Sequence, residues 1–142
     1  MKTTAIKVKS MGLFVSDGRL LVSPGFDHVS RNPHFRLLGG QVEFGERSEE
    51  TLAREMCEEL GAEVDVGELL EVVQNVYVFN GKQKHEIAFI HRARFLDDAF
   101  LRQDELPNIE PGNDEVAKWL PIAEVLNGPV PLFPPTNYAR WL

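Results

Sequence analysis

Cysteine is the scarcest reactive residue in this sequence, and its scarcity limits the chemistry to be considered. Cys57 is the only cysteine among 142 residues, so no intramolecular disulfide can form. It falls on the apolar side of a helix predicted over residues 48–60. We therefore expect a buried, unreactive thiol rather than a nucleophile.

Long apolar runs are also absent. A membrane-spanning helix needs about 18 consecutive apolar residues, and no stretch of this sequence is that long. The N-terminal lysines are not followed by the apolar run and small-residue cleavage site of a secretory signal. We expect a cytoplasmic protein without membrane association.

Basic residues are fewer than acidic ones, which gives a formal net charge of −7 and a pI near 5.1. This balance argues against general binding of nucleic-acid backbones. A small anionic ligand stays compatible with it if a metal ion neutralises the ligand locally. The length fits one domain, residues 1–142, with a core of its own.

The predicted helix at residues 48–60 carries an unusual concentration of carboxylates. Glu55, Glu58 and Glu59 lie opposite its apolar stripe, at spacings that make them neighbours. Like charges repel there, and the last helical turn favours cations over anions. A bound Mg²⁺ or Mn²⁺ would offset this cost, because carboxylate oxygens are hard ligands. The alternative is a solvated acidic face.

A longer pattern surrounds these acids: Gly40, then Glu46, then the segment Arg54-Glu55-Met56-Cys57-Glu58-Glu59-Leu60-Gly61-Ala62. It resembles the Nudix box, G-x5-E-x7-R-E-U-x-E-E-x-G-U, where U is a bulky aliphatic residue. Ala62 departs from the pattern because it is smaller than the usual aliphatic residue, which concerns packing rather than chemistry. Many fixed positions over a short span make a chance match improbable.

The resemblance implies a fold and an activity. The fold would be of the α/β class, a Nudix-type α/β/α sandwich with a mixed β-sheet. The activity would be metal-dependent hydrolysis of the pyrophosphate linkage in a nucleoside diphosphate joined to another moiety. The alternative is a non-catalytic Nudix domain that senses a nucleotide or binds a partner, but such domains typically lose acids of the box.

The resemblance also implies roles for the acids. Glu58 and Glu59 would be the principal Mg²⁺ or Mn²⁺ ligands, and Glu55 a ligand or the general base. Glu46 would be an outer ligand or would support Arg54, whose fork suits holding a carboxylate. The implied metal site comprises Gly40, Glu46, Glu55, Glu58 and Glu59.

The general base need not lie within the box in this family. Glu115 is our first candidate and Asp114 the second, because an acid before the last strand often reaches back to the metal site in Nudix enzymes. Both residues are equally compatible with exposed loop acids.

Candidate substrate contacts lie outside the box. Arg36 precedes the glycines, and Arg31 and His34 are close to it in sequence. His85 and Glu86 belong to a predicted strand and point to opposite faces of it. The alternative for each is an ordinary strand residue at the surface of the sheet. We include Tyr77 as well, since dinucleoside polyphosphate hydrolases of this family often carry a tyrosine nearby.

The C-terminal aromatics Phe133, Tyr138 and Trp141 are expected to pack against the core. Stacking on a nucleobase or a homodimer interface are the alternatives.

The turn and periodicity signals predict the following elements. They are a hairpin of residues 5–15 and 19–23, a loop at 24–33, a strand at 35–38, a helix at 48–60 with Ser48 as N-cap and Gly61 after its end, a hairpin of 68–79 and 83–96, a loop at 97–112, a strand at 113–121 and a helix at 122–126.

The substrate stays open at this point. The proline that marks many ADP-ribose hydrolases is missing, because no proline occurs between Pro33 and Pro107. A nucleoside triphosphate, a nucleotide sugar or a dinucleoside polyphosphate is compatible with the sequence.

Overall fold

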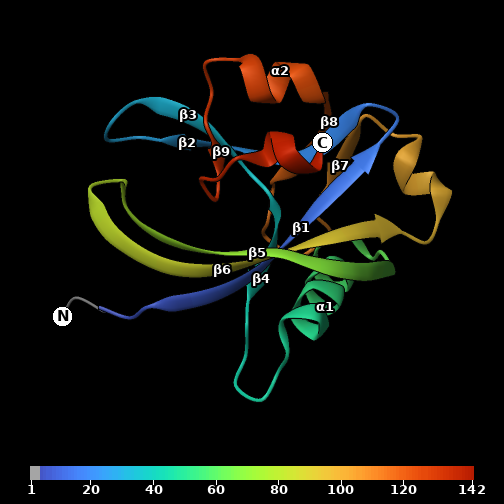
Figure 1. Ribbon diagram of the computed structural model, residues 1–142, viewed down its shortest axis with the longest axis horizontal. Helices are drawn as coiled ribbons and strands as arrows, with labels where there is room; N and C mark the ends of the chain where they lie inside the picture. Colours follow the sequence, from blue (N-terminus) through green and yellow to red (C-terminus); the bar gives the residue numbers. More distant parts are fainter. Residues whose placement is uncertain (1–3) are drawn as a thin grey trace.

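The computed structural model describes residues 4–142 as a twisted mixed β-sheet with helices on both sides (Figure 1). The central strand β1 (Lys7–Ser16) runs parallel to β6 and antiparallel to β4. At its end it turns through Asp17 and Gly18 into β2, pairing Ser16 with Arg19. The mixed sheet and the placement of the helices confirm the predicted fold class.

The strands form two wings that β1 joins (Figure 1). The lower wing holds β1, β4 (Leu38–Gln41), β5 (Val64–Phe79) and β6 (Lys82–Phe95). The upper wing holds β2 (Arg19–Asp27), β3 (Asn32–Arg36), β7 (Glu105–Pro107), β8 (Val116–Pro121) and β9 (Leu132–Phe133).

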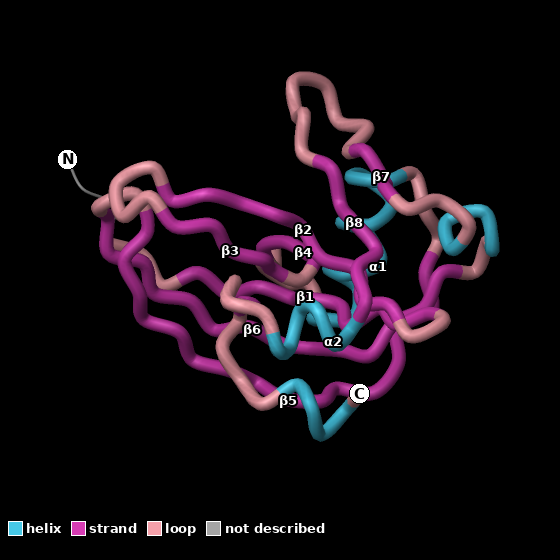
Figure 2. The backbone as a smooth tube through the Cα atoms, turned by 90° about the horizontal axis from the view of Figure 1, so that it is seen from above, coloured by secondary structure: helices cyan, strands magenta, loops and turns pink. Residues whose placement is uncertain are grey.

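Helix α1 (Ser48–Leu60) packs below the sheet against β1, β4 and β5. Above it lie α2 (Ile122–Asn127) and the 3₁₀ turn η2 (Tyr138–Trp141), and a second 3₁₀ turn, η1 (Asp98–Leu101), follows β6. The C-terminal segment lies over β5 (Figure 2), where Arg140 pairs with Glu71. No helix within residues 4–142 has the length and apolar character that crossing a membrane requires.

Two apolar clusters hold the layers together. In one, Leu52 and Met56 of α1 pack on Phe14 of β1. The other cluster joins the two wings, because it contains Val73 and Ile90 of the lower wing together with buried residues of the upper wing. Burying one such side chain is worth about 1.5–3 kcal/mol, so the apolar face of α1 fixes the helix that carries the acids.

The ends of α1 show one success and one error of the sequence-based prediction. Gly61 has a left-handed φ of 66° and donates to the carbonyl of Cys57, as expected for the residue after a helix. Ser48, however, is already helical, and Arg47 is the N-cap. The N–H of Arg47 donates to Glu50 Oε1 at 3.0 Å, so the carboxylate of Glu50 satisfies the cap.

Cys57 is exposed, so the prediction of a buried thiol is wrong. The buried stripe of α1 is narrower than the periodicity suggested. It follows positions 52, 56 and 60, and Cys57 lies about 100° around the helix from Met56.

The segment at 24–33 is also not a loop throughout. Strand β2 continues to Asp27 and β3 begins at Asn32, with Pro24 opposite Phe35. Pro24 is tolerated because β8 pairs with β2 only over residues 19–22, so no second neighbour needs its missing N–H.

The other expected elements differ mainly at their ends. Strand β5 begins at Val64 rather than 68, and β8 begins at Val116 rather than 113. The predicted loop at 97–112 contains η1 and β7, so much of it has regular structure.

Candidate functional site

Arg54 organises the acids of α1 and the loop before it. Its Nε and Nη2 donate to the two oxygens of Glu46, at 2.8 and 3.1 Å, which is a bidentate pair. Thr51 Oγ1 adds a hydrogen bond to Glu46 at 2.6 Å. The bonds from Arg54 are the main reason that the pKa of Glu46 falls to about 2. Glu46 is therefore an ionised, fixed support for Arg54.

The other side of the guanidinium faces the helix. Its Nη1 donates to Glu55 Oε1 at 3.1 Å and to Glu58 Oε2 at 3.1 Å. Its Nη2 also donates to the carbonyl of Gln41 at 3.1 Å. These bonds, led by the one to Glu46, raise the pKa of Arg54 above its ordinary value. One cation thus orients three carboxylates, which is the arrangement that an orienting role requires.

Gly40 makes room for Glu55. It lies on β4 opposite Ser10 of β1, and a Cβ built on it would lie 2.1 Å from Cδ of Glu55. Any side chain at position 40 would collide with this carboxylate. The glycine of the box therefore leaves the space that the Glu55 carboxylate occupies against the β4 backbone.

Glu59 lies at the C-terminal end of α1 and is half-buried. Burial is the main cause that raises its pKa to about 8, and the negative charges of Glu55, Glu110 and Glu115 add to it. Burial likewise raises the pKa of Glu55. Excess negative charge is therefore concentrated at this end of the helix.

The loop after β7 supplies two of these neighbours. The N–H of Ile109 donates to the carbonyl of Glu59 at 2.8 Å, which holds the loop against the helix end. Glu110 was not predicted as a site residue, although it belongs to the polar loop predicted at residues 97–112.

The residues present fit a divalent cation by donor type and by electrostatics. Carboxylate oxygens are hard donors, and burial, with a smaller contribution from neighbouring acids, raises the pKa of Glu55 and Glu59. A bound cation would favour the ionised form of both carboxyls. Within residues 4–142 no three His, Cys, Asp or Glu side chains converge as a complete metal site. The geometry brings Glu55 and Glu58 together on Arg54 instead.

Arg36 and Glu115 connect these acids with a cavity. Arg36 Nη2 donates to Glu115 Oε2 at 3.0 Å. Both residues line a small recess with Glu59, and both also line the large cavity of the protein. The pair therefore lies at the boundary between the acidic end of α1 and the cavity.

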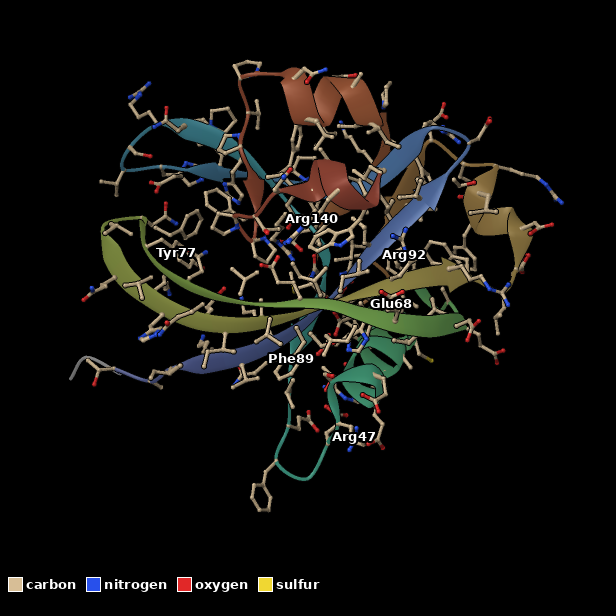
Figure 3. The ribbon with its side chains drawn as sticks, viewed as in Figure 1. Arg47, Glu68, Tyr77, Phe89, Arg92 and Arg140 are labelled. Carbon is tan, nitrogen blue, oxygen red and sulfur yellow. The ribbon has the colours of Figure 1, made fainter. Side chains whose placement is uncertain are left out.

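The large cavity has a volume of about 690 Å³ and lies between the β2–β3 hairpin and the β5–β6 hairpin. Tyr77 points into the space between the wings (Figure 3) and donates to Glu86 at 2.9 Å. Lys9 Nζ pairs with the same oxygen at 2.8 Å. Two predicted substrate contacts, Tyr77 and Glu86, thus line this cavity together.

Further cavity residues were not predicted. Asn75 lines the cavity on the same face of β5 as Tyr77, as their spacing of two requires, so strand periodicity could have identified it. Lys9 had no such signal, because the parallel pairing of β1 with β6 brings it near Glu86.

His85 is the exception among the predicted contacts. It lies on the opposite face of β6 from Glu86, bonds to Gln74 at 3.0 Å and does not line the cavity.

The C-terminal aromatics divide between the core and the cavity. Tyr138 is buried with its hydroxyl donating to the carbonyl of Pro134 at 2.6 Å, and Trp141 packs edge-on against it. Phe133 instead lines the cavity, with its ring stacked on Tyr77 at 6.2 Å between centroids. The prediction that the C-terminal aromatics pack against the core therefore holds for Tyr138 and Trp141 but not for Phe133.

Comparison with known proteins agrees with this geometry. The family model of the NUDIX domain matches residues 7–140. A MutT NUDIX hydrolase from Burkholderia pseudomallei is 29% identical, with a TM-score of 0.59, covering 82% of this chain and 84% of that one. The MutT protein from Methanosarcina mazei Go1 is 19% identical with a TM-score of 0.61, covering 89% and 85%. A NUDIX hydrolase from Nitrosomonas europaea is 18% identical with a TM-score of 0.60, covering 85% and 76%.

Proposed function

This chain belongs to the Nudix family of pyrophosphohydrolases, and we propose that it hydrolyses a nucleoside triphosphate or another compound in which a nucleoside diphosphate is linked to a further group. Nudix hydrolases generally use divalent metal ions, and we propose Mg²⁺ or Mn²⁺ here. The observation that carries the proposal is the Arg36–Glu115 pair, which borders both the acidic end of α1 and the large cavity.

The cavity suits the nucleoside part of such a substrate. Its volume of about 690 Å³ falls within the range of small-molecule sites. The aromatic rings of Tyr77, Phe79 and Phe133 in its lining offer stacking surfaces for a base. The polar groups of Asn75 and Glu86 offer hydrogen bonds to its edges.

The acids of α1 suit the pyrophosphate part. Glu58 and Glu59 would hold the divalent ion, with Glu55 as a further ligand or the base and Glu46 as its outer support. When bound, such an ion neutralises phosphate charge and lowers the pKa of coordinated water. Attack on a polyanion needs this neutralisation, since hydroxide and phosphate otherwise repel each other.

The remaining residues position these groups. Arg54 holds Glu46, Glu55 and Glu58 in one orientation through its fork. Arg36 provides a cation at the boundary of the cavity, where it would bind the phosphate that adjoins the nucleoside. To do so it would give up its hydrogen bond to Glu115. Glu115, once released, is the first candidate for the base outside the helix.

A screen for nucleotide products by anion-exchange chromatography tests the proposal, because cleavage of the pyrophosphate linkage gives a nucleoside monophosphate and a second phosphorylated fragment. Nucleoside triphosphates, nucleotide sugars, dinucleoside polyphosphates, ADP-ribose and capped RNA would be incubated with the protein and Mg²⁺ or Mn²⁺. We expect turnover that depends on the metal and is abolished in Glu59→Gln. Glu68→Gln is the matched control, because Glu68 is exposed on β5. No turnover across the panel would contradict the proposal and favour a nucleotide-sensing domain.

Two further expectations stay predictions. The cytoplasmic location rests on the sequence and on the family, and a homodimer is compatible with both. Light scattering after size-exclusion chromatography decides between monomer and dimer.

A further inference from the structure

The tips of the two hairpins that enclose the cavity are tied to each other. The N–H of His28, at the β2–β3 tip, donates to Asn80 Oδ1 at 2.8 Å. The N–H of Asn80, in the β5–β6 turn, donates back to Asp27 Oδ2 at 3.1 Å. All three residues line the cavity. We refer to these two hydrogen bonds as the Asp27–Asn80 bridge.

Asp27 is held in place for this contact. It is only 8% exposed, and its Oδ1 accepts from the N–H groups of Val29 and Ser30 at 2.9 and 3.0 Å. The second oxygen is thereby directed across the cavity to Asn80. The hydrogen bond from Ser30 is the first of several that lower the pKa of Asp27, so it stays ionised near neutral pH.

The β5–β6 turn does not need the side chain of Asn80. Asn80 and Gly81 have φ values of 51° and 76°, the conformation of a two-residue hairpin turn. Asp17 and Gly18 form the same turn in the β1–β2 hairpin, with φ values of 52° and 72°, and no bond from the Asp17 side chain to another hairpin is recorded within residues 4–142. The bond from His28 to Asn80 is therefore additional to the turn.

The bridge lies at the far end of the cavity from Arg36. In the register of β2 and β3, Arg36 is opposite Ser23 and Asn32 is opposite Asp27. Four residues of extended chain separate these points, a distance of roughly 13 Å. The bridge and the Arg36–Glu115 pair thus mark the two ends of the space.

We propose that the Asp27–Asn80 bridge sets the length of the group that the cavity accepts, so that the enzyme acts on substrates with a single unextended nucleoside. This inference rests on the proposed function and deepens it, because it assumes that the nucleoside lies in the cavity. The joined hairpin tips lie across the end of the cavity opposite Arg36, so a long substituent on a base that points toward this end would meet the bridge.

The test compares nucleoside triphosphates with the same nucleotides carrying a biotin linker on the base. The measured quantity is the ratio of kcat/KM for the extended substrate to that for the parent. We expect the wild type to discriminate about tenfold, which corresponds to about 1.4 kcal/mol. Asn80→Gly should raise the ratio, because glycine keeps the turn and removes the acceptor of the His28 N–H. The backbone N–H of residue 80 still donates to Asp27 in this variant, so Asp27→Ala/Asn80→Gly, which removes both bonds, should raise the ratio several-fold.

Asp17→Gly is the matched control, since it makes the same change in the equivalent turn away from the cavity; it should leave the ratio at the wild-type value. Melting temperatures confirm that all of these proteins are folded. An unchanged ratio in Asp27→Ala/Asn80→Gly, with parent nucleotides still turned over, would overturn the role of the bridge alone. A wild type that turns over no parent nucleotide would overturn both the proposed function and this inference.

Discussion

Gly40→Ala is the sharpest perturbation that the site offers. The added Cβ would lie 2.1 Å from Cδ and 2.3 Å from Oε1 of Glu55. Non-bonded carbon atoms prefer separations of about 3.5–4.0 Å, so the carboxylate must move by roughly 1.4 Å or more. A displacement of about 1 Å at a catalytic group can cost about 100-fold in rate. We therefore expect kcat to fall by about two orders of magnitude.

Stability should change far less. Overpacking typically costs about 1–3 kcal/mol, and Glu55 can swing its terminal atoms aside, so the lower end of this range applies. The free energy of unfolding, measured by urea titration, should fall by about 1 kcal/mol. The assay for kcat uses the substrate found in the screen, at saturating metal.

Gly18→Ala is the control for stability. Gly18 has a φ of 72° with nothing within 4 Å of the added Cβ, so the change strains the backbone by about 1–2 kcal/mol without touching the site. It should lose stability and keep activity. A Gly40→Ala protein with kcat within threefold of the wild type would refute the reasoning that Glu55 must lie against the backbone of residue 40.

Three further predictions concern the charged groups. Arg54→Lys should lower kcat about 10–100-fold, because a lysine cannot hold both oxygens of Glu46 while reaching the helix; steady-state rates check this, and full activity would show that the fork is dispensable. In the metal-free protein, Glu59 binds its proton more tightly when folded, with a pKa of about 8, than at its ordinary value of 4.5. The melting temperature should therefore fall as pH rises from 4.5 to about 8, and Glu59→Gln should flatten that slope; an equal slope in both proteins would contradict the assignment. Arg36→Ala should raise KM roughly tenfold with a smaller effect on kcat, since it removes a charged contact to the substrate; a selective loss of kcat instead would place Arg36 at the reacting phosphate.

The contacts of the site that join residues close in the sequence could be predicted, and those that join distant residues could not. Helical spacing places Arg54 beside Glu58, its neighbour in sequence is Glu55, and Arg54 donates hydrogen bonds to both carboxylates. The fork on Glu46 was also an expectation, because it needs only a short loop to fold back on the helix. The prediction that Cys57 is buried was wrong, because amphipathic spacing gives the direction of the apolar face of a helix but not its width.

The cavity was less predictable because residues far apart in the sequence build it. Glu86 meets Lys9 through the parallel pairing of β6 with β1, and Tyr77 meets Phe133 through the return of the C-terminal segment. Neither pairing leaves a signal in local periodicity. His85 illustrates the same limit, since strand alternation separates it from Glu86 but cannot tell which face borders the cavity.

The family, the helix and the set of acids could be predicted from the sequence, because they depend on spacings within one short segment. The position of these acids relative to the cavity depends on long-range pairing of strands and could not be predicted in this way. Arg36 and Glu115 lie between the cavity and α1, and Asp27 and Asn80 link the two hairpin tips at its far end. These contacts span 79 and 53 positions of the chain, so they exist only once the strands have paired.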